Sequence, residues 1–133
     1  MGGVAGFHSG GYQIKGCTCS DCTIKTGKVL TSGIGALMGN IGNAAHTTGA
    51  GCAVNCTIDA FEGSTEVGMI VGHFNGNTKV ITLGTEDSKI KVKGTVKIGG
   101  TSTVLDSGNY SSYLWGLGNY SSSYHTFYTE YGE

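Results

Sequence analysis

Short apolar blocks alternate with clusters of Gly, Asn, Ser and Thr along most of this chain. The stretches TKVITLG (78–84) and SKIKVKGTVKIG (88–99) alternate residue by residue, and in the second the apolar side chains face one way and the lysines the other. A period of two is typical of half-buried β-strands, and β-branched residues favour strands further. Frequent glycine costs roughly 1 kcal/mol per residue in a helix. The pattern therefore predicts an all-β protein, with 88–99 as one long strand or two strands around a kink.

A glycine-framed phrase recurs at a fixed interval in the first three quarters of the chain. Each copy holds two glycines four residues apart around paired apolar residues, and the copies follow one another at a constant step of ~33 residues. The glycine pairs are Gly2 and Gly6, Gly35 and Gly39, and Gly68 and Gly72. Repetition at this length indicates stacked structural units, and glycine fits corners where positive φ or close backbone approach excludes a side chain.

Two apolar columns run through the repeats and predict inward ladders of stacked side chains. The first expected ladder is Val4, Leu37 and Ile70; the second is Ile24, Ile58 and Ile90. We predict a single domain over 1–133, a short β-helix-like β-solenoid of ~33-residue repeats with an aromatic C-terminal cap. The repeats span about 2–32, 33–66 and 67–100, and the divergent cap segment spans 101–133.

Composition and charge exclude several classes of function. The chain has 133 residues, with 8 Lys, no Arg and 9 acidic residues, for a net charge of −1. A near-neutral chain lacks the cationic surface that dominates nucleic-acid affinity, so we expect no nucleic-acid partner. No apolar run reaches the ~18 residues of a membrane helix, so we expect no membrane insertion. The opening MGGVAGFHSG also lacks the basic start and long apolar stretch of a signal peptide.

The repeated phrase resembles the bacterial GLUG-type repeat, a Gly-Leu-(Val/Ile)-Gly unit followed by Asn/Gly-rich turns. The most similar stretches are GGVAGFHSGG (2–11) and VGMIVGHFNGN (67–77), and GIGALMGNIGN (33–43) is a weaker copy. The resemblance covers roughly residues 2–100. It implies a stalk or adhesive module of an exported bacterial surface protein, and therefore an extracellular or cell-surface location. The family pattern has no catalytic residues to transfer.

Five cysteines lie in the first two repeats, in the motifs CTCSDC (17–22) and CAVNC (52–56). Thiolates at such spacings can chelate a soft metal, but neither motif has the paired C-x-x-C spacing of a zinc ribbon. The repeat suggests stacking instead, of Cys19 on Cys52 and of Cys22 on Cys56, about 5 Å apart and within disulfide range. We favour stacked or disulfide-bonded cysteines, with no metal and no cofactor. A catalytic thiol would require a nearby histidine and an orienting partner.

The C-terminal segment 105–131 departs from the repeat and is rich in aromatic residues. One interpretation is a glycan-binding face, since aromatic rings pack against sugar rings and neighbouring Asn and Ser donate hydrogen bonds. The other is a cap that covers the last exposed strand edges, with HTFYTEY (125–131) as a closing strand. Both interpretations stay open. The candidate binding residues are Tyr110, Tyr113, Trp115, Tyr120 and Tyr124.

Remaining polar residues show no catalytic constellation. The histidines, His8, His46, His73 and His125, form no ligand motif and are expected at the surface or at corners. We therefore predict a non-catalytic structural or adhesive module, not an enzyme, with a glycan or protein partner or self-association through the solenoid ends into a fibre. The alternative is a β-helical carbohydrate-active enzyme, which would require a carboxylate or basic cluster on one face. An ice-binding solenoid would require a threonine ladder, and the threonines share no obvious repeat position.

Overall fold

A computed structural model describes residues 1–8, 14–42, 46–74, 80–116 and 125–133 of the chain. Their regular structure is β-strand apart from one short 3-10 helix, which confirms the all-β prediction. These residues contain no helix long and apolar enough to cross a membrane. The elements are β1 (Ala5–His8), β2 (Thr18–Lys25), β3 (Ile34–Gly35), β4 (Met38–Ile41), β5 (His46–Thr48), β6 (Ala53–Ala60), β7 (Val67–Gly68), β8 (Val71–Phe74), β9 (Ile81–Leu83), β10 (Ile90–Ile98), β11 (Thr101–Val104), η1 (Tyr110–Tyr113), β12 (His125–Phe127) and β13 (Thr129–Tyr131).

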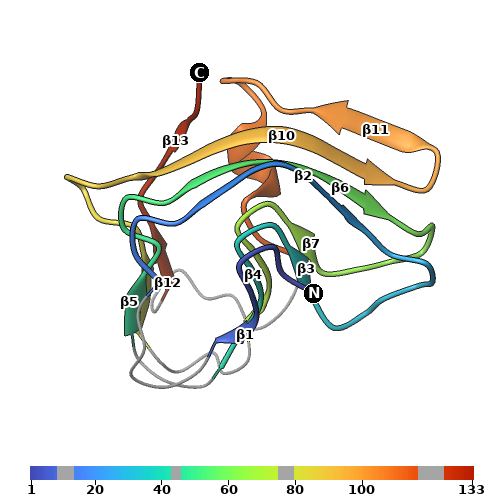
Figure 1. The fold of residues 1–133 in the computed structure, drawn as a ribbon, viewed down its shortest axis with the longest axis horizontal. Coiled ribbons are helices and arrows are strands. Elements are labelled where there is room, and N and C mark those ends of the chain that lie inside the picture. The colour runs from blue at the N-terminus through green and yellow to red at the C-terminus, as the bar shows by residue number, and fades with distance from the viewer. Residues whose placement is uncertain (9–13, 43–45, 75–79, 117–124) are drawn as a thin grey trace.

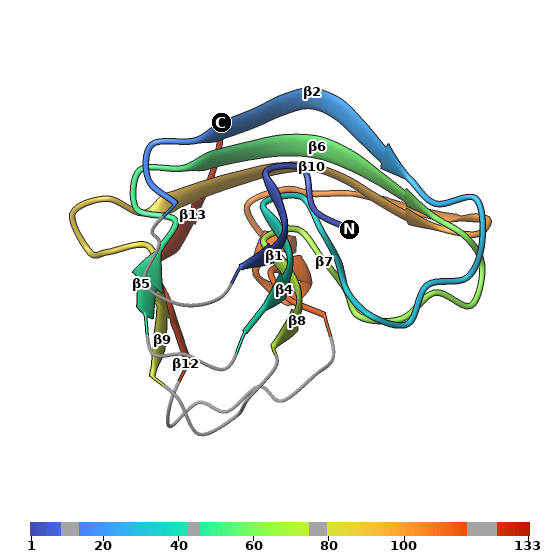
Figure 2. The same cartoon turned by 60° about the horizontal axis from the view of Figure 1, so that its bottom comes forward.

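The strands form four separate sheets that do not close on one another. Three sheets contain the series β1-β4-β8, β2-β6-β10 and β5-β9-β12, and the fourth is the short pair β3-β7; every pairing in these series is parallel. Figure 1 shows the three series around a common interior, and Figure 2 shows β2, β6 and β10 lying side by side in chain order. The repeat therefore appears as parallel pairing between successive units.

Register follows the predicted period most closely at the glycine phrase. Ala5 pairs with Met38, and Met38 pairs with Val71, so each step along the chain equals the step between successive glycine phrases. A Cβ atom at Gly35 would clash with the Met38 carbonyl, and one at Gly72 would clash with the backbone nitrogen of Ile34. These glycines are therefore required by close backbone approach between units rather than by positive φ.

One predicted ladder is only partly formed. Leu37 and Ile70 are fully buried, but Val4 is 40% exposed. Val4 lies in the first unit and donates its N–H to the Leu37 carbonyl, so only one of its sides is covered by a neighbouring unit. The ladder thus loses its burial at the N-terminal end of the stack.

The second predicted ladder is wrong in its third member. Ile24 pairs with Ile58, but Ile58 pairs with Val96 instead of Ile90. The step along the chain from one unit to the next is longer at the Ala53–Lys91 pair than at the Met38–Val71 pair. Longer connections before β10 take up the extra residues, so alignment by a constant period fails there. Within β10 itself the alternation is confirmed: Ile90 and Val92 are buried and the strand is continuous.

The outer face of the long sheet carries a threonine column that the repeat did not predict. Pairing across β2, β6 and β10 stacks Thr23, Thr57 and Thr95. The neighbouring column holds Lys25 and Asp59, whose side chains form an ion pair at 3.9 Å. A single threonine column beside charged residues is not the flat regular ladder of an ice-binding face.

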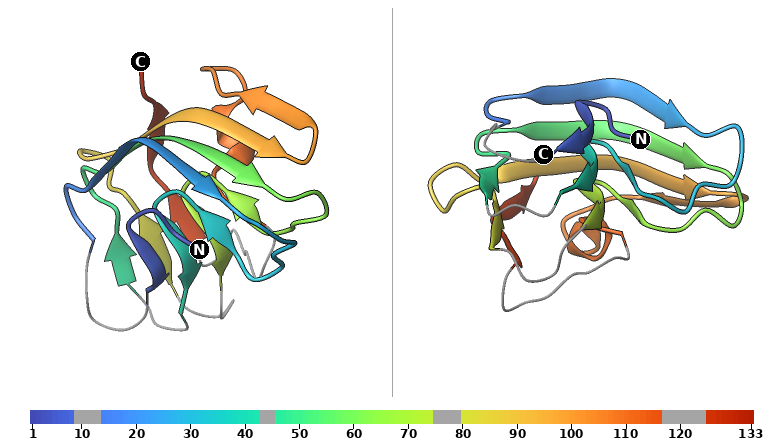
Figure 3. Two further views of the ribbon diagram at one scale, coloured as in Figure 1. Left: turned by 45° about the vertical axis from the view of Figure 1, so that its right-hand side comes forward. Right: turned by 90° about the horizontal axis from the view of Figure 1, so that it is seen from below.

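The two ends of the stack are built differently, as Figure 3 shows. At the C-terminal end, β13 and β11 pair with the outer edge of β10, and β12 pairs with β9. The predicted closing segment 125–131 therefore forms two short strands rather than one. At the N-terminal end, β1 and β2 each pair with one strand only among the residues that the structure describes.

Candidate functional site

A β-bulge in β2 turns two cysteines to the same face of the strand. Residues three apart in a regular strand point to opposite faces. The register with β6 shifts between Ser20 and Cys22, which leaves Asp21 as an extra residue, with φ of 55°. Cys19 is buried and Cys22 is half-buried, whereas Ser20 and Asp21 are exposed. The bulge therefore directs both thiols inward.

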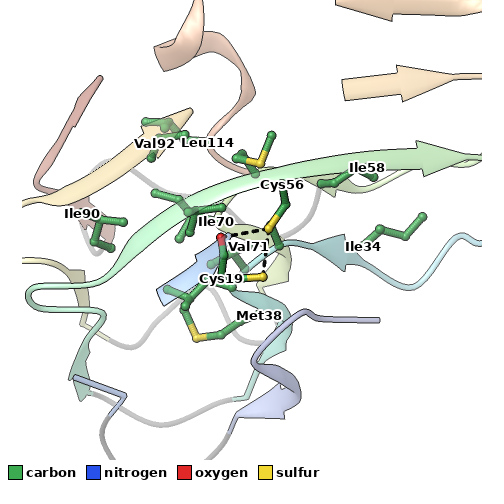
Figure 4. Close-up of a cluster of buried hydrophobic side chains, with 14 of the residues drawn as sticks. Cys19, Ile34, Met38, Cys56, Ile58, Ile70, Val71, Ile90, Val92 and Leu114 are labelled. Atoms are coloured by element: carbon green, nitrogen blue, oxygen red, sulfur yellow. Dashed lines mark hydrogen bonds between the residues drawn. The ribbon is translucent and has the colours of Figure 1, made fainter. Parts of the chain in front are cut away.

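Cys56 of β6 completes a cluster of three thiols. Its Sγ lies 2.9 Å from the Cys19 Sγ and 2.8 Å from the Cys22 Sγ, and the Cys19 and Cys22 sulfurs are 2.9 Å apart. The Cys56 thiol also donates to the Cys19 carbonyl at 3.0 Å. Figure 4 shows the Cys19 and Cys56 side chains directed toward each other from neighbouring strands, among buried apolar residues. We call Cys19, Cys22 and Cys56 the thiol cluster.

Glycines and apolar residues surround the thiol cluster. Gly94 of β10 lies opposite Cys56 with φ of 132°, and a Cβ there would clash with the Cys56 backbone. A Cβ at Gly3 would lie 2.6 Å from the Cys19 Sγ. Burial raises the pKa of the Cys19 and Cys56 thiols, and the neighbouring thiols raise that of Cys56 further. Near pH 7 these two side chains are therefore neutral thiols.

The other two cysteines form a separate pair. The Cys17 N–H donates to the Cys52 Sγ at 3.3 Å, and all five cysteines are free thiols. The expected stacking of Cys22 on Cys56 agrees with the register. The expected stacking of Cys19 on Cys52 does not, because Cys19 pairs with Val54 and Cys17 lies beside Cys52. The period of the glycine phrase does not hold in this part of β2, because the bulge that follows changes the register with β6.

The aromatic residues of the C-terminal segment pack largely against one another. Trp115 is half-buried and stacks on Phe127 with ring centroids 4.6 Å apart. Phe127 in turn meets Phe74 edge-on, and Phe74 stacks on His125 at 4.5 Å. His125 is buried, so its expected surface position is wrong.

The remaining predicted binding residues divide between the surface of the cap and undescribed segments. Tyr110 and Tyr113 lie in η1 and are half-buried, and Tyr110 approaches Tyr131 with ring centroids 6.1 Å apart. Tyr120 and Tyr124 lie outside the described residues. The five predicted residues therefore do not appear together as one exposed aromatic platform.

A shallow groove of 460 Å³ lies beside Trp115. Its lining combines Trp115 with several serine and threonine residues and a single acidic residue, Glu66. The lining residues are Ser64, Thr65, Glu66, Val67, Ile98, Ser111, Ser112, Trp115 and Gly116. The Glu66 carboxylate lies 3.0 Å from the His73 Nδ1, and both side chains are mostly buried. Sequence spacing gave no signal for this pair, since the two residues meet across a corner between β7 and β8.

Comparison of the chain with protein-family models, with curated proteins and with solved structures finds no match.

Proposed function

We propose that this chain is a non-catalytic structural module, a short β-solenoid of three stacked units with a C-terminal cap. The parallel pairing of successive units supports this proposal, as do the glycines that allow their backbones to approach closely. The resemblance to GLUG-type repeats supports a place in an exported bacterial surface protein. The groove beside Trp115 is lined by one acidic residue, Glu66, and by no lysine or arginine, which is not the carboxylate or basic cluster that the enzyme alternative requires.

The observation that carries the proposal is the difference between the two edges of the long sheet. At one edge β10 is covered by the short strands β11 and β13, of four and three residues, while at the other edge the eight-residue β2 has β6 as its only partner among the described strands. An open strand edge offers a row of N–H and C=O groups to another chain. When β2 of one copy pairs with β2 of a second copy, both chains use the same surface, which yields a closed pair of chains and not a continuing fibre. We therefore propose self-association of two copies through β2.

The backbone of β2 identifies a residue at which to test this pairing. The Thr26 N–H donates to the Asp59 carbonyl of β6 at 3.1 Å. In a parallel strand alternate residues bond to the same neighbour, so the Thr23 N–H, three positions earlier, points away from β6. Proline at position 23 therefore removes an outward donor without removing a bond to β6.

Sedimentation equilibrium over a range of protein concentrations tests the proposal. We expect the unmodified chain to form dimers with rising concentration, Thr23→Pro to remain monomeric, and Thr23→Val, which keeps the N–H, to dimerise normally. Circular dichroism checks that the variants keep their β-structure. A monomeric wild-type chain at the highest concentration, or a dimeric Thr23→Pro chain, would contradict pairing through β2.

A second candidate function is glycan binding in the groove beside Trp115. The observation that favours it is the combination of Trp115, Ser111, Ser112 and one acidic residue in the lining of the same depression. Because Trp115 also packs on Phe127, its replacement would disturb the cap, and a groove-filling Ser112→Trp variant is the cleaner test. Binding on a glycan array should be lost in Ser112→Trp and kept in Ser102→Trp, on exposed β11. Equal binding by both variants would remove the groove as the site.

A further inference from the structure

We propose that the thiol cluster binds one zinc ion through the sulfur atoms of Cys19, Cys22 and Cys56. The inference is independent of the proposed structural role, and it departs from the absence of metal expected from the sequence. The three sulfurs form a nearly equilateral triangle with sides of 2.8–2.9 Å. They are the one group of metal-ligating side chains that converge this closely among the described residues.

The geometry requires only a small expansion to accept the ion. Zinc–sulfur bonds of about 2.3 Å in a tetrahedral site place sulfurs about 3.8 Å apart, so each sulfur must move outward by about half an ångström. Cys22 is half-buried, which leaves its side chain free to adjust and gives the ion a path from solvent. Gly3 adds no side chain beside the Cys19 sulfur, where a Cβ would lie at 2.6 Å.

The third thiol distinguishes a metal site from a disulfide. A disulfide between Cys22 and Cys56, which are directly paired across β2 and β6, would need neither Cys19 nor the bulge. The bulge places Asp21 in a left-handed conformation that a non-glycine residue rarely adopts, and its effect is to bring a third sulfur to the same distance. Three equivalent donors are what a metal ion uses and a disulfide cannot use.

Charge favours zinc over a monovalent soft ion. Binding releases three protons, since each thiol must become a thiolate, and three thiolates with Zn²⁺ carry a net charge of −1. The same ligands with Cu⁺ would carry −2, which costs more in an apolar environment. No fourth His, Cys, Asp or Glu ligand joins the group among the described residues, so a water molecule on the Cys22 side fills the fourth position.

Zinc at this position would join two neighbouring units of the stack. Cys19 and Cys22 belong to β2, at the open edge, and Cys56 belongs to the central strand β6. Ion binding should therefore raise the melting temperature and protect β2 in particular from hydrogen exchange.

Metal titration of the fully reduced chain under anaerobic conditions tests the site. We expect one Zn²⁺ per chain in competition with a chromophoric chelator, with release of three protons. Co²⁺ in its place should give the visible spectrum of a tetrahedral thiolate site. Cys22→Ser should weaken zinc binding by more than about 100-fold, since it removes a direct ligand. Cys17→Ser is the matched control, because Cys17 lies outside the thiol cluster. The zinc affinity of this variant should equal that of the unmodified chain.

Three results would overturn the proposal. The first is no stoichiometric zinc binding by the reduced chain, and the second is equal loss in Cys17→Ser and Cys22→Ser. The third is stoichiometric Cu⁺ binding with zinc excluded, which would assign the cluster to a different ion. Circular dichroism monitors folding of each variant. Cys56 is fully buried, so Cys56→Ser is a secondary variant, and the cobalt spectrum of the unmodified chain tests the site even if that variant does not fold.

Discussion

The two ends of the stacked strands differ in how their strand edges are covered. At the C-terminal end, β11, β12 and β13 occupy the edges of β9 and β10, and aromatic rings fill the space beneath them. At the N-terminal end, the described part of the chain leaves the edge of β2 open, and all five cysteines lie in or beside β2 and its neighbour β6. The comparison teaches that a repeated unit always leaves an edge, and that closing an edge requires sequence which departs from the repeat.

Removing the strands that cover the C-terminal end should have the largest effect on the folding and solubility of the chain. Deletion of residues 125–133 uncovers β9 and the first part of β10 and removes the buried His125 side chain. We expect the truncated chain to aggregate or to lose its β-structure, because both ends of the stack would then be open. Size-exclusion chromatography and circular dichroism measure this. Deletion of Glu133 alone is the control and should leave a soluble, folded chain; equal behaviour of both truncations would refute the capping role.

Alanine substitutions in the glycine phrase should destabilise the chain strongly inside the stack and only slightly at its N-terminal end. A Cβ at Gly72 would clash with the backbone of Ile34, so Gly72→Ala should destabilise the chain by about 3 kcal/mol. Gly6 occupies the same place in the first repeat, where a Cβ meets nothing within 4 Å. Gly6→Ala should change the free energy of unfolding by less than about 0.5 kcal/mol. Urea unfolding of both variants provides the measurement, and similar losses would contradict close approach as the reason for Gly72.

Truncation of Trp115 should loosen the covered end without abolishing folding. The half-buried indole stacks on Phe127, so Trp115→Ala should cost about 2 kcal/mol, less than a fully buried aromatic would. Phe61 is 51% exposed, and Phe61→Ala should be nearly neutral. Thermal unfolding of the two variants compares them. A neutral Trp115→Ala would mean that the indole does not hold the cap in place.

Alkaline pH should produce the smallest loss of stability, and this loss should come from a cysteine near the N-terminal end. Burial raises the pKa of the Cys52 thiol above the ordinary value of 9.0. Its contribution to stability is therefore complete below pH 9.0 and is lost as pH rises from there through the folded-state pKa. The loss is at most about 1.4 kcal/mol per pH unit for one group. Urea unfolding of reduced protein at neutral and alkaline pH should show a smaller decline in Cys52→Ala than in wild type; identical declines would assign the loss to other groups.

The sequence alone predicts the parts of the fold that depend on local pattern. Alternation in β10 and the glycine period identify strands and pairing between units, because both reflect side-chain direction and close backbone approach. The pairing of Cys22 with Cys56 follows from the repetition only approximately, because these residues are 34 positions apart.

Features that depend on register between distant strands were not predictable. Aspartate is enriched among the non-glycine residues with positive φ, but most aspartates lie elsewhere, so Asp21 alone does not identify a bulge, and the convergence of Cys19 with Cys56 depends on that bulge. The longer step between units before β10 depends on turn lengths. Because of this longer step, Ile58 pairs with Val96 and not with Ile90 as predicted. The stacking of Trp115 on Phe127 depends on the pairing of β12 with β9, which the sequence pattern does not specify.

The glycine contacts also bear on how a sequence of this kind changes by mutation over generations. Within this one molecule the step along the chain from a residue to its partner is longer at Ala53–Lys91 than at Met38–Val71, so insertions in the turns are already accommodated. The backbone of Gly72, in contrast, leaves no space for a single methyl group against Ile34. We therefore expect a turn of this chain to tolerate added residues, while a further unit placed inside the stack would have to carry the closely packed glycines with it.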